Sequence, residues 1–279
     1  MLNNIITPWE EPESQQGFFV PEYIEQMAWD VLEEFDFQTK SMECVTTKAD
    51  KGGAIWKLET SEGPKSLKLL HRRPTRSLFS LAAQEYLVHV QNARVPEIIK
   101  TKTGSYYVLA GGMVWFVAEW IEPLAPVSKD LEGAKQLCYA IGEFHRLTRG
   151  FTPPPEVEVS SRLYKWPKQY EKIIRKMDWF RNIASLYDDM PASSRILDVV
   201  DYFEEQAIDS YRRLMESKYK ELVQLGKEYW GLAHQDYGWS NGQMGPGGMW
   251  IIDLDGVSYD LAIRDLSKLI TGSMTDLGY

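Results

Sequence analysis

The sequence predicts an α+β protein of two lobes, with helices and an antiparallel sheet in the N-terminal lobe and a mainly helical C-terminal lobe. Its 279 residues are enough for two packed lobes and too few for three ordinary domains. Strand-like apolar runs separated by glycine turns occupy much of residues 42–118. From residue 131 onward, apolar residues recur mainly at helical spacing, so the two patterns define the two lobes.

The N-terminal lobe is predicted at residues 21–121, after a loosely ordered arm at residues 1–20 that lacks periodicity. A helix is expected over residues 21–35, because its apolar residues repeat at helical spacing and proline is tolerated in a first turn. A second helix is expected over residues 78–90. Strands are expected at 44–46, 55–58, 66–70, 106–110 and 113–118, the last two joined by a Gly-Gly hairpin turn.

The C-terminal lobe is predicted at residues 122–279, with helices over 131–147 and 260–270. A helical insertion is expected at residues 151–227, following a run of three prolines. Its aromatic residues either line a substrate pocket or form ordinary helix–helix core, as aromatic side chains commonly do. The residues in question are Trp166, Tyr170, Trp179 and Tyr187.

Composition narrows the class of protein. The chain is 44% hydrophobic and 25% charged, which is typical of globular proteins, and no apolar run approaches the ~20 residues of a membrane span. With no signal-peptide pattern at the N-terminus, we expect synthesis in the cytoplasm and no membrane association. The net charge of −9 argues against nucleic acid as a partner. Cys44 and Cys138 are too isolated for a disulfide framework or a zinc site.

Two charged residues of the N-terminal lobe are predicted to point inward. Lys68 lies in an apolar strand, and a buried ammonium needs a partner. Glu85 shares the apolar face of the following helix, which makes it the expected partner. The alternative is a lysine that reaches solvent along the surface and a glutamate at the edge of the core.

One strand before Lys68, the pair Gly52-Gly53 lies between two predicted strands. Paired glycines allow backbone amides to approach a phosphate closely. An ordinary hairpin turn explains the same pair, and only its position relative to Lys68 favours a phosphate-binding role.

Polar residues with the spacing of a phosphoryl-transfer site lie near the C-terminus. The pattern His234-x-Asp236 is followed by Asn241, and the apolar run 249–252 then places Asp253 at a strand end. One carboxylate can accept the proton of an attacking hydroxyl, while amide and carboxylate oxygens are the ligands that Mg²⁺ prefers. The alternative is a loop of surface carboxylates with a turn-forming asparagine.

These residues resemble the CotS-type spore coat family, within the aminoglycoside phosphotransferase and choline kinase branch of the protein-kinase-like superfamily. The resemblance implies that Asp236 is the catalytic base and that Asn241 and Asp253 bind the metal. His234 is then expected to fix the loop, and Asp255 to assist the metal or only to hold the strand end. Gln235 stands where protein kinases have an arginine. Because a phosphorylated activation loop pairs with that arginine, we do not expect this kind of control here.

The same resemblance implies ATP and Mg²⁺ as cofactors. Gly52, Gly53 and Lys68 would contact the phosphates, and Glu85 would complete this cofactor-binding set by pairing with Lys68. The backbone from Glu119 to Ile121 would pair with adenine as the hinge between the lobes. On the helix over 260–270, Asp265 resembles the aspartate that braces the catalytic loop. His145 is expected to be a core histidine with no catalytic role.

Two functions follow from the resemblance. The first is an ATP-dependent phosphotransferase acting on a small hydroxyl-bearing compound. The alternative is a structural spore coat protein that uses the fold for assembly with other coat proteins and has little or no turnover. Either protein would be made in the cytoplasm, and deposition in the spore coat is an expectation of the resemblance. Relatives usually carry further C-terminal helices, so we also expect a chain shortened at that end.

Overall fold

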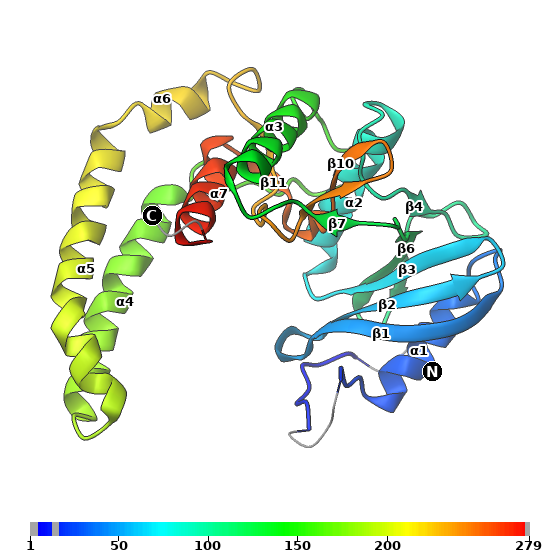
Figure 1. Ribbon diagram of the computed structural model, residues 1–279, viewed down its shortest axis with the longest axis horizontal. Helices are drawn as coiled ribbons and strands as arrows, with labels where there is room; N and C mark the ends of the chain where they lie inside the picture. The colour runs from blue at the N-terminus through cyan, green and yellow to red at the C-terminus, as the bar shows by residue number, and fades with distance from the viewer. Residues whose placement is uncertain (1–4, 13–16, 277–279) are drawn as a thin grey trace. The chain divides into compact units, whose positions relative to one another are not determined.

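The computed structural model describes residues 5–12 and 17–276, with side chains up to Thr271 (Figure 1). The chain divides into two compact units. The first comprises Met1–Ser160, Leu232–Ser258 and Ala262–Tyr279, and the second comprises Ser161–Gly231 and Tyr259–Leu261. The first unit therefore holds the sheet together with the polar motif at 234–255, whereas most of the predicted insertion forms a unit of its own.

The N-terminal sheet is antiparallel, as the sequence predicts, and its strand order is β1-β2-β3-β6-β4, with β5 also pairing with β6 (Figure 1). Its strands are β1 (Thr39–Lys48), β2 (Gly53–Thr60), β3 (Gly63–Leu70), β4 (Ile98–Ile99), β5 (Val108–Ala110) and β6 (Met113–Glu119). Lys68 lies opposite Ile55 on β2 and Phe116 on β6. Lys68 is therefore carried by a central strand of the sheet.

Helix α1 (Glu22–Leu32) covers one face of this sheet. Its apolar stripe joins a core cluster that includes Trp56, Leu67 and Leu69, and the indoles of Trp56 and Trp115 stack at 5.6 Å between centroids. Because strand side chains alternate between faces, the burial of Leu67 and Leu69 under α1 directs Lys68 to the opposite face.

Helix α2 (Pro74–His89) contributes to a second core cluster. Leu81 packs there with Leu70, Phe116 and other apolar residues of β3 and β6. The helix begins four residues before the predicted start, because Pro74 has the fixed φ angle that suits a first helical turn. Helix α1 therefore packs on the sheet in the first core cluster, and helix α2 packs on it in the second.

The rest of the first unit carries the polar motif. Its helices are α3 (Leu131–Leu147) and α7 (Ile263–Asp276), and its strands are β7 (Ala125–Pro126), β9 (Gly242–Gly245) and β10 (Gly248–Ile251). Short 3₁₀ turns η1 (Ala49–Lys51) and η2 (Leu254–Gly256) follow β1 and β10. Strands β9 and β10 form a hairpin, and β7 pairs with β9. The strands β8 (Gly231–Ala233) and β11 (Ser258–Asp260) bound the motif on either side.

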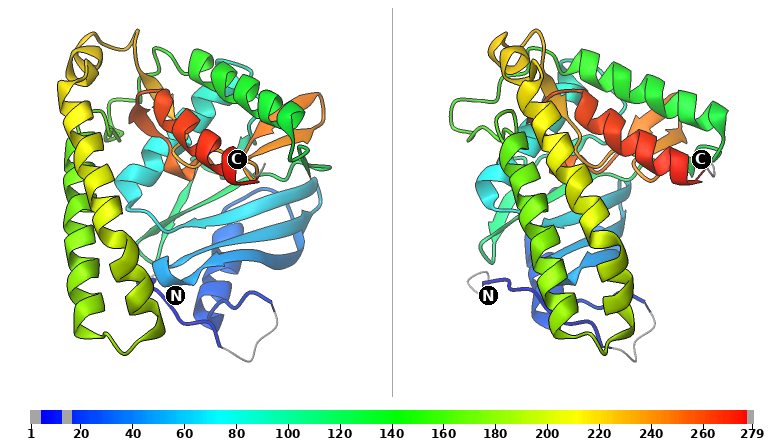
Figure 2. Two further views of the ribbon diagram at one scale, coloured as in Figure 1. Left: turned by 60° about the vertical axis from the view of Figure 1, so that its left-hand side comes forward. Right: turned by 90° about the vertical axis from the view of Figure 1, so that its left-hand side faces the viewer.

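The second unit is a helical hairpin. Helices α4 (Trp166–Leu186) and α5 (Pro191–Glu216) run side by side, followed by the short helix α6 (Tyr219–Gln224) (Figure 2). Arg181 on α4 bonds Asp201 on α5 at 2.8 Å and also pairs with Glu204. All three helices lie within the helical insertion that the sequence predicts at residues 151–227.

The predicted arm is only partly described, since residues 1–4 and 13–16 lie outside the described residues. Ile6 is 5% exposed and its N–H donates to Gly111 O at 2.9 Å. The indole of Trp9 donates to Phe19 O at 2.9 Å. The described stretches of the arm are therefore held by packing and hydrogen bonds, which sequence periodicity does not reveal.

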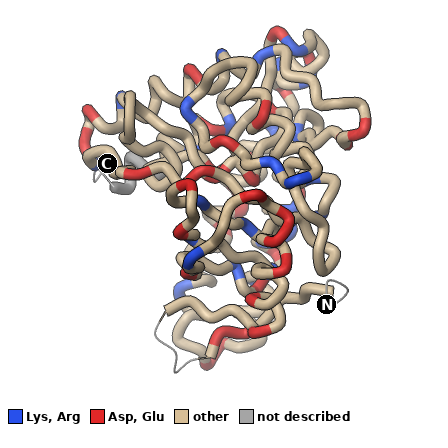
Figure 3. The backbone as a smooth tube through the Cα atoms, turned by 90° about the vertical axis from the view of Figure 1, so that its right-hand side faces the viewer, with Lys and Arg blue, Asp and Glu red and all other residues tan. Residues whose placement is uncertain are grey.

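Charges of both signs are interspersed over the face shown in Figure 3. The chain is acidic as a whole, with a net charge of −9. Among the helices that the structure describes, none combines the length and the apolar character that crossing a bilayer requires.

Candidate active site

The site is organised around an ion pair between Lys68 on β3 and the segment that follows β10. Lys68 Nζ lies 3.4 Å from Asp253 Oδ1 and 3.9 Å from Asp255 Oδ1. It also lies 6.0 Å from the centre of the Phe116 ring. Asp253 adopts a left-handed backbone conformation with φ 60°, which is unusual for a residue other than glycine. Residues 185 positions apart in sequence therefore meet at one point.

The three groups shift one another's protonation. Burial opposes the charge of Lys68, but Asp255 and Asp253 outweigh it, so the lysine pKa is raised. Burial also opposes the charge of Asp253, but Lys68 lowers the pKa of that carboxyl to about 2. The pKa of Asp255 is raised, chiefly by burial and against the pull of Lys68, with Asp253 adding repulsion. Two largely buried carboxylates thus share Lys68 as their ion-pair partner.

A cavity of about 900 Å³ opens beside this ion pair. That volume is at the upper end of the ~300–1,000 Å³ typical of small-molecule sites. Five residues that the sequence predicts for the site line it, namely Lys68, Glu119, Ile121, Asn241 and Asp253. Apolar walls come from Val45, Ile55, Phe116, Ala118, Trp120, Leu124 and Leu254, among others. The cavity therefore has the size and composition to hold a nucleotide base beside a charged end.

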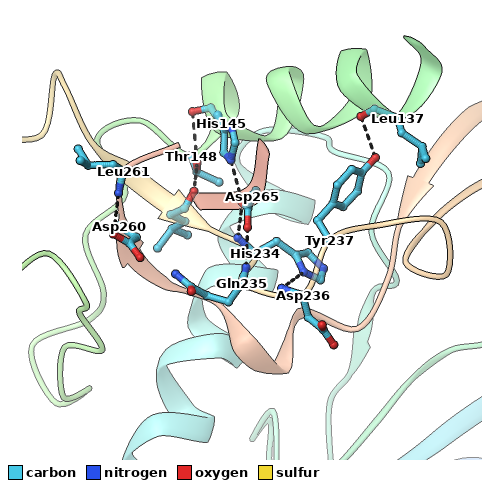
Figure 4. Close-up of polar contacts among 11 residues, drawn as sticks. Leu137, His145, Thr148, His234, Gln235, Asp236, Tyr237, Asp260, Leu261 and Asp265 are labelled. Atoms are coloured by element: carbon cyan, nitrogen blue, oxygen red, sulfur yellow. Dashed lines mark hydrogen bonds and ion pairs between the residues drawn. The ribbon is translucent and has the colours of Figure 1, made fainter. Parts of the chain in front are cut away.

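The predicted brace from Asp265 is present (Figure 4). Asp265 on α7 is 1% exposed, and its two oxygens accept the backbone N–H groups of His234 and Gln235, each at 2.8 Å. His145 Nε2 on α3 lies 2.9 Å from the same carboxylate. Gln235 has φ 74°, so the carboxylate holds a strained turn in place. The backbone that presents Asp236 is therefore fixed from two helices.

His234 is fully buried, and burial lowers its pKa against the influence of Asp265. Its Nε2 lies 2.9 Å from Ile252 O, and its Nδ1 accepts the N–H of Asp236 at 3.4 Å. This pattern requires a neutral ring with its proton on Nε2. The ring links the motif loop to the strand that precedes Asp253, so His234 positions both halves of the site.

Asp236 and Asn241 occupy the loop after β8. The Asn241 side chain is 8% exposed, and its Nδ2 donates to Asp236 O at 2.7 Å, which leaves the amide oxygen available at the cavity wall. The Asp236 carboxylate is half-exposed and forms an ion pair with Lys268 of α7. Asp236 does not line the 900 Å³ cavity itself, so it is reachable from solvent beside the proposed nucleotide position.

Replacing Asp265 with alanine is expected to lower the free energy of unfolding by about 3 kcal/mol, because two buried backbone donors and a histidine lose a charged acceptor. Urea denaturation followed by circular dichroism measures the change. Asp198 on α5 is exposed, so Asp198→Asn is the matched control and should stay within about 0.5 kcal/mol of the native protein. Equal losses in the two variants would contradict the bracing role.

The predicted pair between Lys68 and Glu85 is not formed. The ion partners of Lys68 are Asp253 and Asp255, whereas Glu85 lies 3.3 Å from His89 Nε2 one turn along α2. Burial raises the pKa of Glu85, and His89 opposes that rise. The physical reason is that two carboxylates across the cleft already neutralise the ammonium. Sequence spacing placed Glu85 on the inward face of α2 but could not indicate which carboxylate lies closest.

The two glycines before Lys68 have different surroundings. Gly52 has φ 74°, and a β-carbon there would lie 3.5 Å from Ile6 Cγ2, so this glycine packs on the N-terminal arm. Gly53 lines a cavity of about 20 Å³ together with Lys68 and Asp255. Neither glycine lines the larger cavity. The structure thus brings Gly53 to the charged end of the site and leaves Gly52 outside it, as part of a turn.

The predicted hinge borders the cavity through Glu119, Trp120 and Ile121. The N–H of Glu119 donates to Glu97 O at 2.9 Å, and the N–H of Trp120 donates to Pro64 O at 3.3 Å. The N–H of Ile121 forms no hydrogen bond with the part of the chain that the structure describes. Adenine recognition by a hinge donor would therefore fall to Ile121 and not to Glu119.

His71 borders the small cavity and is expected to make stability depend on pH. Burial lowers its pKa from 6.5 to about 4, with Lys48, Arg72 and Lys51 adding to the shift and Asp253 opposing it. Between these values the unfolded chain binds a proton that the folded protein does not, so stability falls as the pH drops from about 6.5 to 4.

For this half-buried ring, solvent screening reduces the expected loss to about 1 kcal/mol. The measurement is urea denaturation at about pH 4.5, 5.5 and 7.5 for the native protein and for His71→Gln. The native protein should lose more stability than the variant. Parallel curves would show that His71 does not titrate in this window.

Two features of the site escaped sequence reasoning. Lys268 contacts Asp236, and Lys48 is close enough to lower the pKa of Asp253 and of Asp255. Lys268 lies on the exposed side of an amphipathic helix, and Lys48 ends an ordinary strand. The one available signal was the position of Lys268 three residues after Asp265, nearly one helical turn along the same helix.

Comparison with known proteins adds to this geometry. No family model matches the chain. Spore coat protein S of Bacillus subtilis (strain 168) is 27% identical over 259 residues, which cover 92% of this chain and 72% of that protein. An aminoglycoside phosphotransferase from Alicyclobacillus acidocaldarius superposes with a TM-score of 0.69 at 17% identity, covering 94% of this chain and 74% of the other. The chain is therefore similar in sequence to spore coat protein S, and it has a protein-kinase-like fold.

Further solved structures share the fold of this chain. Amicoumacin kinase hAmiN, solved in complex with AMP-PNP, Ca²⁺ and Ami, has a TM-score of 0.59 at 16% identity, covering 90% of this chain and 69% of the other. A microcompartment-associated aminopropanol kinase has a TM-score of 0.56 at 14% identity, covering 89% of this chain and 73% of the other. These likenesses confirm the two-lobed fold expected from the sequence.

Proposed function

We propose that this protein is an ATP-dependent phosphotransferase that acts on a small hydroxyl-bearing compound. The observation that carries the proposal is the meeting of Lys68 with Asp253 beside a 900 Å³ cavity lined by the hinge segment. Small-molecule kinases among the solved structures with this fold support the same reaction class. Lys68 would exchange its contacts with Asp253 and Asp255 for nucleotide phosphate oxygens.

The cluster of oxygen ligands suits a divalent cation. Asp253 and Asp255 are two carboxylates that share Lys68 as their ion-pair partner. Asn241 lines the cavity and donates its amide N–H to Asp236 O, which leaves its amide oxygen as a further ligand. Carboxylate and amide oxygens are the donors that Mg²⁺ prefers. When bound by these three residues, Mg²⁺ would neutralise charge on the phosphate oxygens. Asp253 is the stronger candidate of the two carboxylates, because its low pKa keeps it ionised.

In the proposed reaction the acceptor hydroxyl attacks the γ-phosphorus in line. Its oxygen forms a bond to phosphorus, the bond from phosphorus to the β–γ bridging oxygen breaks, and ADP leaves. Asp236 takes the hydroxyl proton, and His234 with Asp265 holds the loop so that this carboxylate stays in place. The acceptor must approach from the side where Asp236 is open to solvent and paired with Lys268.

A second candidate is a structural role in the spore coat, with the kinase-like fold serving assembly. The similarity to spore coat protein S favours it. The two roles differ in nucleotide binding, because a scaffold has no need of it. Deposition in a spore coat is compatible with both.

A thermal-shift titration with MgATP tests the proposed function. At 100 times its dissociation constant a ligand adds about 2.7 kcal/mol of stability, so a clear rise in Tm is expected. The same titration with EDTA in place of Mg²⁺ should give a smaller rise. A flat response at millimolar MgATP would favour the scaffold and reject the phosphotransferase.

A further inference from the structure

Two arginines beside the start of α2 lack acceptors for their buried donors. Arg72 lies in the loop after β3, and Arg76 lies in the first turn of α2. Both residues are half-buried, and the Nε of each is inaccessible to solvent and has no hydrogen-bond partner. Neither guanidinium forms an ion pair within the residues that the structure describes. Buried donors of a charged group are normally paired, so this arrangement indicates a missing acceptor.

The local field is positive and unbalanced. Helix α2 has no acidic residue in its first turn and no side-chain cap, while its N-terminus carries partial positive charge. Burial lowers the pKa of Arg76, and the neighbouring Arg72 lowers it further. Two like charges are therefore held close together at a helix end that itself favours an anion.

The acidic group that Arg72 influences is already engaged. Arg72 is close enough to Asp255 to lower its pKa, but Asp255 also interacts with Lys68 at 3.9 Å. An Nη2 atom of Arg72 lies 3.7 Å from the position that a β-carbon on Gly256 would occupy, so the guanidinium sits against the backbone of η2. Neither arginine lines the 900 Å³ cavity. The arginine pair is thus separate from the proposed nucleotide position.

We propose that Arg72 and Arg76 bind a phosphate-type oxyanion between the start of α2 and the turn η2. Guanidinium groups present parallel N–H donors that match the oxygens of phosphate. The anion supplies acceptors for N–H groups of both guanidiniums and neutralises the repulsion between the two side chains. It also joins α2 to the turn that carries Asp255, so its occupancy is coupled to the position of that carboxylate.

Titration with inorganic phosphate, against sodium chloride at matched ionic strength, tests the site by calorimetry and thermal shift. The native protein is expected to bind phosphate. Arg72→Gln and Arg76→Gln should each weaken binding about tenfold or more, because a charge-assisted contact is lost. Arg73 lies between them but is exposed, so Arg73→Gln is the matched control and should bind as the native protein does.

Further arms locate the anion and its source. Arg76→Lys keeps the charge but removes Nε, and it should also bind less tightly if the fork geometry matters. Lys68→Met should retain phosphate binding, whereas loss of binding in that variant alone would place the anion at the nucleotide site and overturn the proposal. Phenyl phosphate compared with inorganic phosphate distinguishes a phosphoryl group on a small molecule from the free ion. The proposal would also be overturned if the native protein bound no phosphate. The same holds if Arg72→Gln and Arg76→Gln bound phosphate as tightly as the control Arg73→Gln.

Discussion

Asp236→Asn is expected to lower the rate of phosphoryl transfer about 10²–10⁴-fold, which is the usual contribution of a positioned general base. Asparagine has nearly the same shape but cannot accept the hydroxyl proton. The brace from Asp265 acts on the backbone of the preceding residues, so the loop should keep its conformation. MgATP affinity should change little, because Asp236 does not line the cavity. A coupled ADP-release assay with candidate acceptors measures the rate.

The control for this variant addresses the ion pair with Lys268. Lys268→Met removes the same pair but keeps the carboxylate, and an exposed pair contributes only about 0–1 kcal/mol to stability. Transfer by Lys268→Met should therefore stay far above that of Asp236→Asn. Native turnover in the asparagine variant would reject Asp236 as the base while leaving nucleotide binding untouched.

Asp253→Asn is expected to lower transfer about 10²–10³-fold, the size of effect seen when one preorganised electrostatic contact is removed. The variant should also weaken MgATP binding while ATP binding in EDTA changes little, because the carboxylate is assigned to the metal. Lys68 keeps a partner in this variant, since Asp255 lies 3.9 Å away, so the fold should survive. Calorimetric titrations with and without Mg²⁺ measure the difference.

Asp255→Asn is the matched comparison, because it resolves whether that residue assists the metal or only holds the strand end. Its raised pKa makes it the less ionised carboxylate, so its loss should affect Mg²⁺ dependence less than the loss of Asp253. If both variants kept native Mg²⁺ dependence, the assignment of the metal ligands would be wrong.

The sequence predicted the fold and several local features well, for identifiable reasons. Alternation in β3 placed Lys68 on the face opposite Leu67 and Leu69, and the structure has that arrangement. The helix over Leu131–Leu147 was predicted to its observed bounds, because it has an N-cap at Asp130 and a regular apolar stripe. Local patterns of this kind are set by neighbours in the chain, so they can be read without the tertiary structure.

Pairing across the cleft was much less predictable. Glu85 was the nearest inward carboxylate in sequence, yet Asp253 and Asp255 neutralise Lys68. Gly52 faces Ile6 of the arm and not the cavity. Each of these contacts joins segments that are far apart in the chain. Local sequence spacing does not predict which distant segments come into contact in the folded protein.

By itself, the sequence determined which side chains can do chemistry and on which face of its element each one lies. It could not determine how far apart those side chains come to rest. The tertiary structure alone decided that Lys68 meets two aspartates and that Asp265 accepts two backbone donors. It also decided that the Nε atoms of Arg72 and Arg76 find no acceptor among the described residues. The physical reason is that side-chain direction follows from local backbone geometry, whereas charge pairing depends on distances between segments that only the packed core fixes.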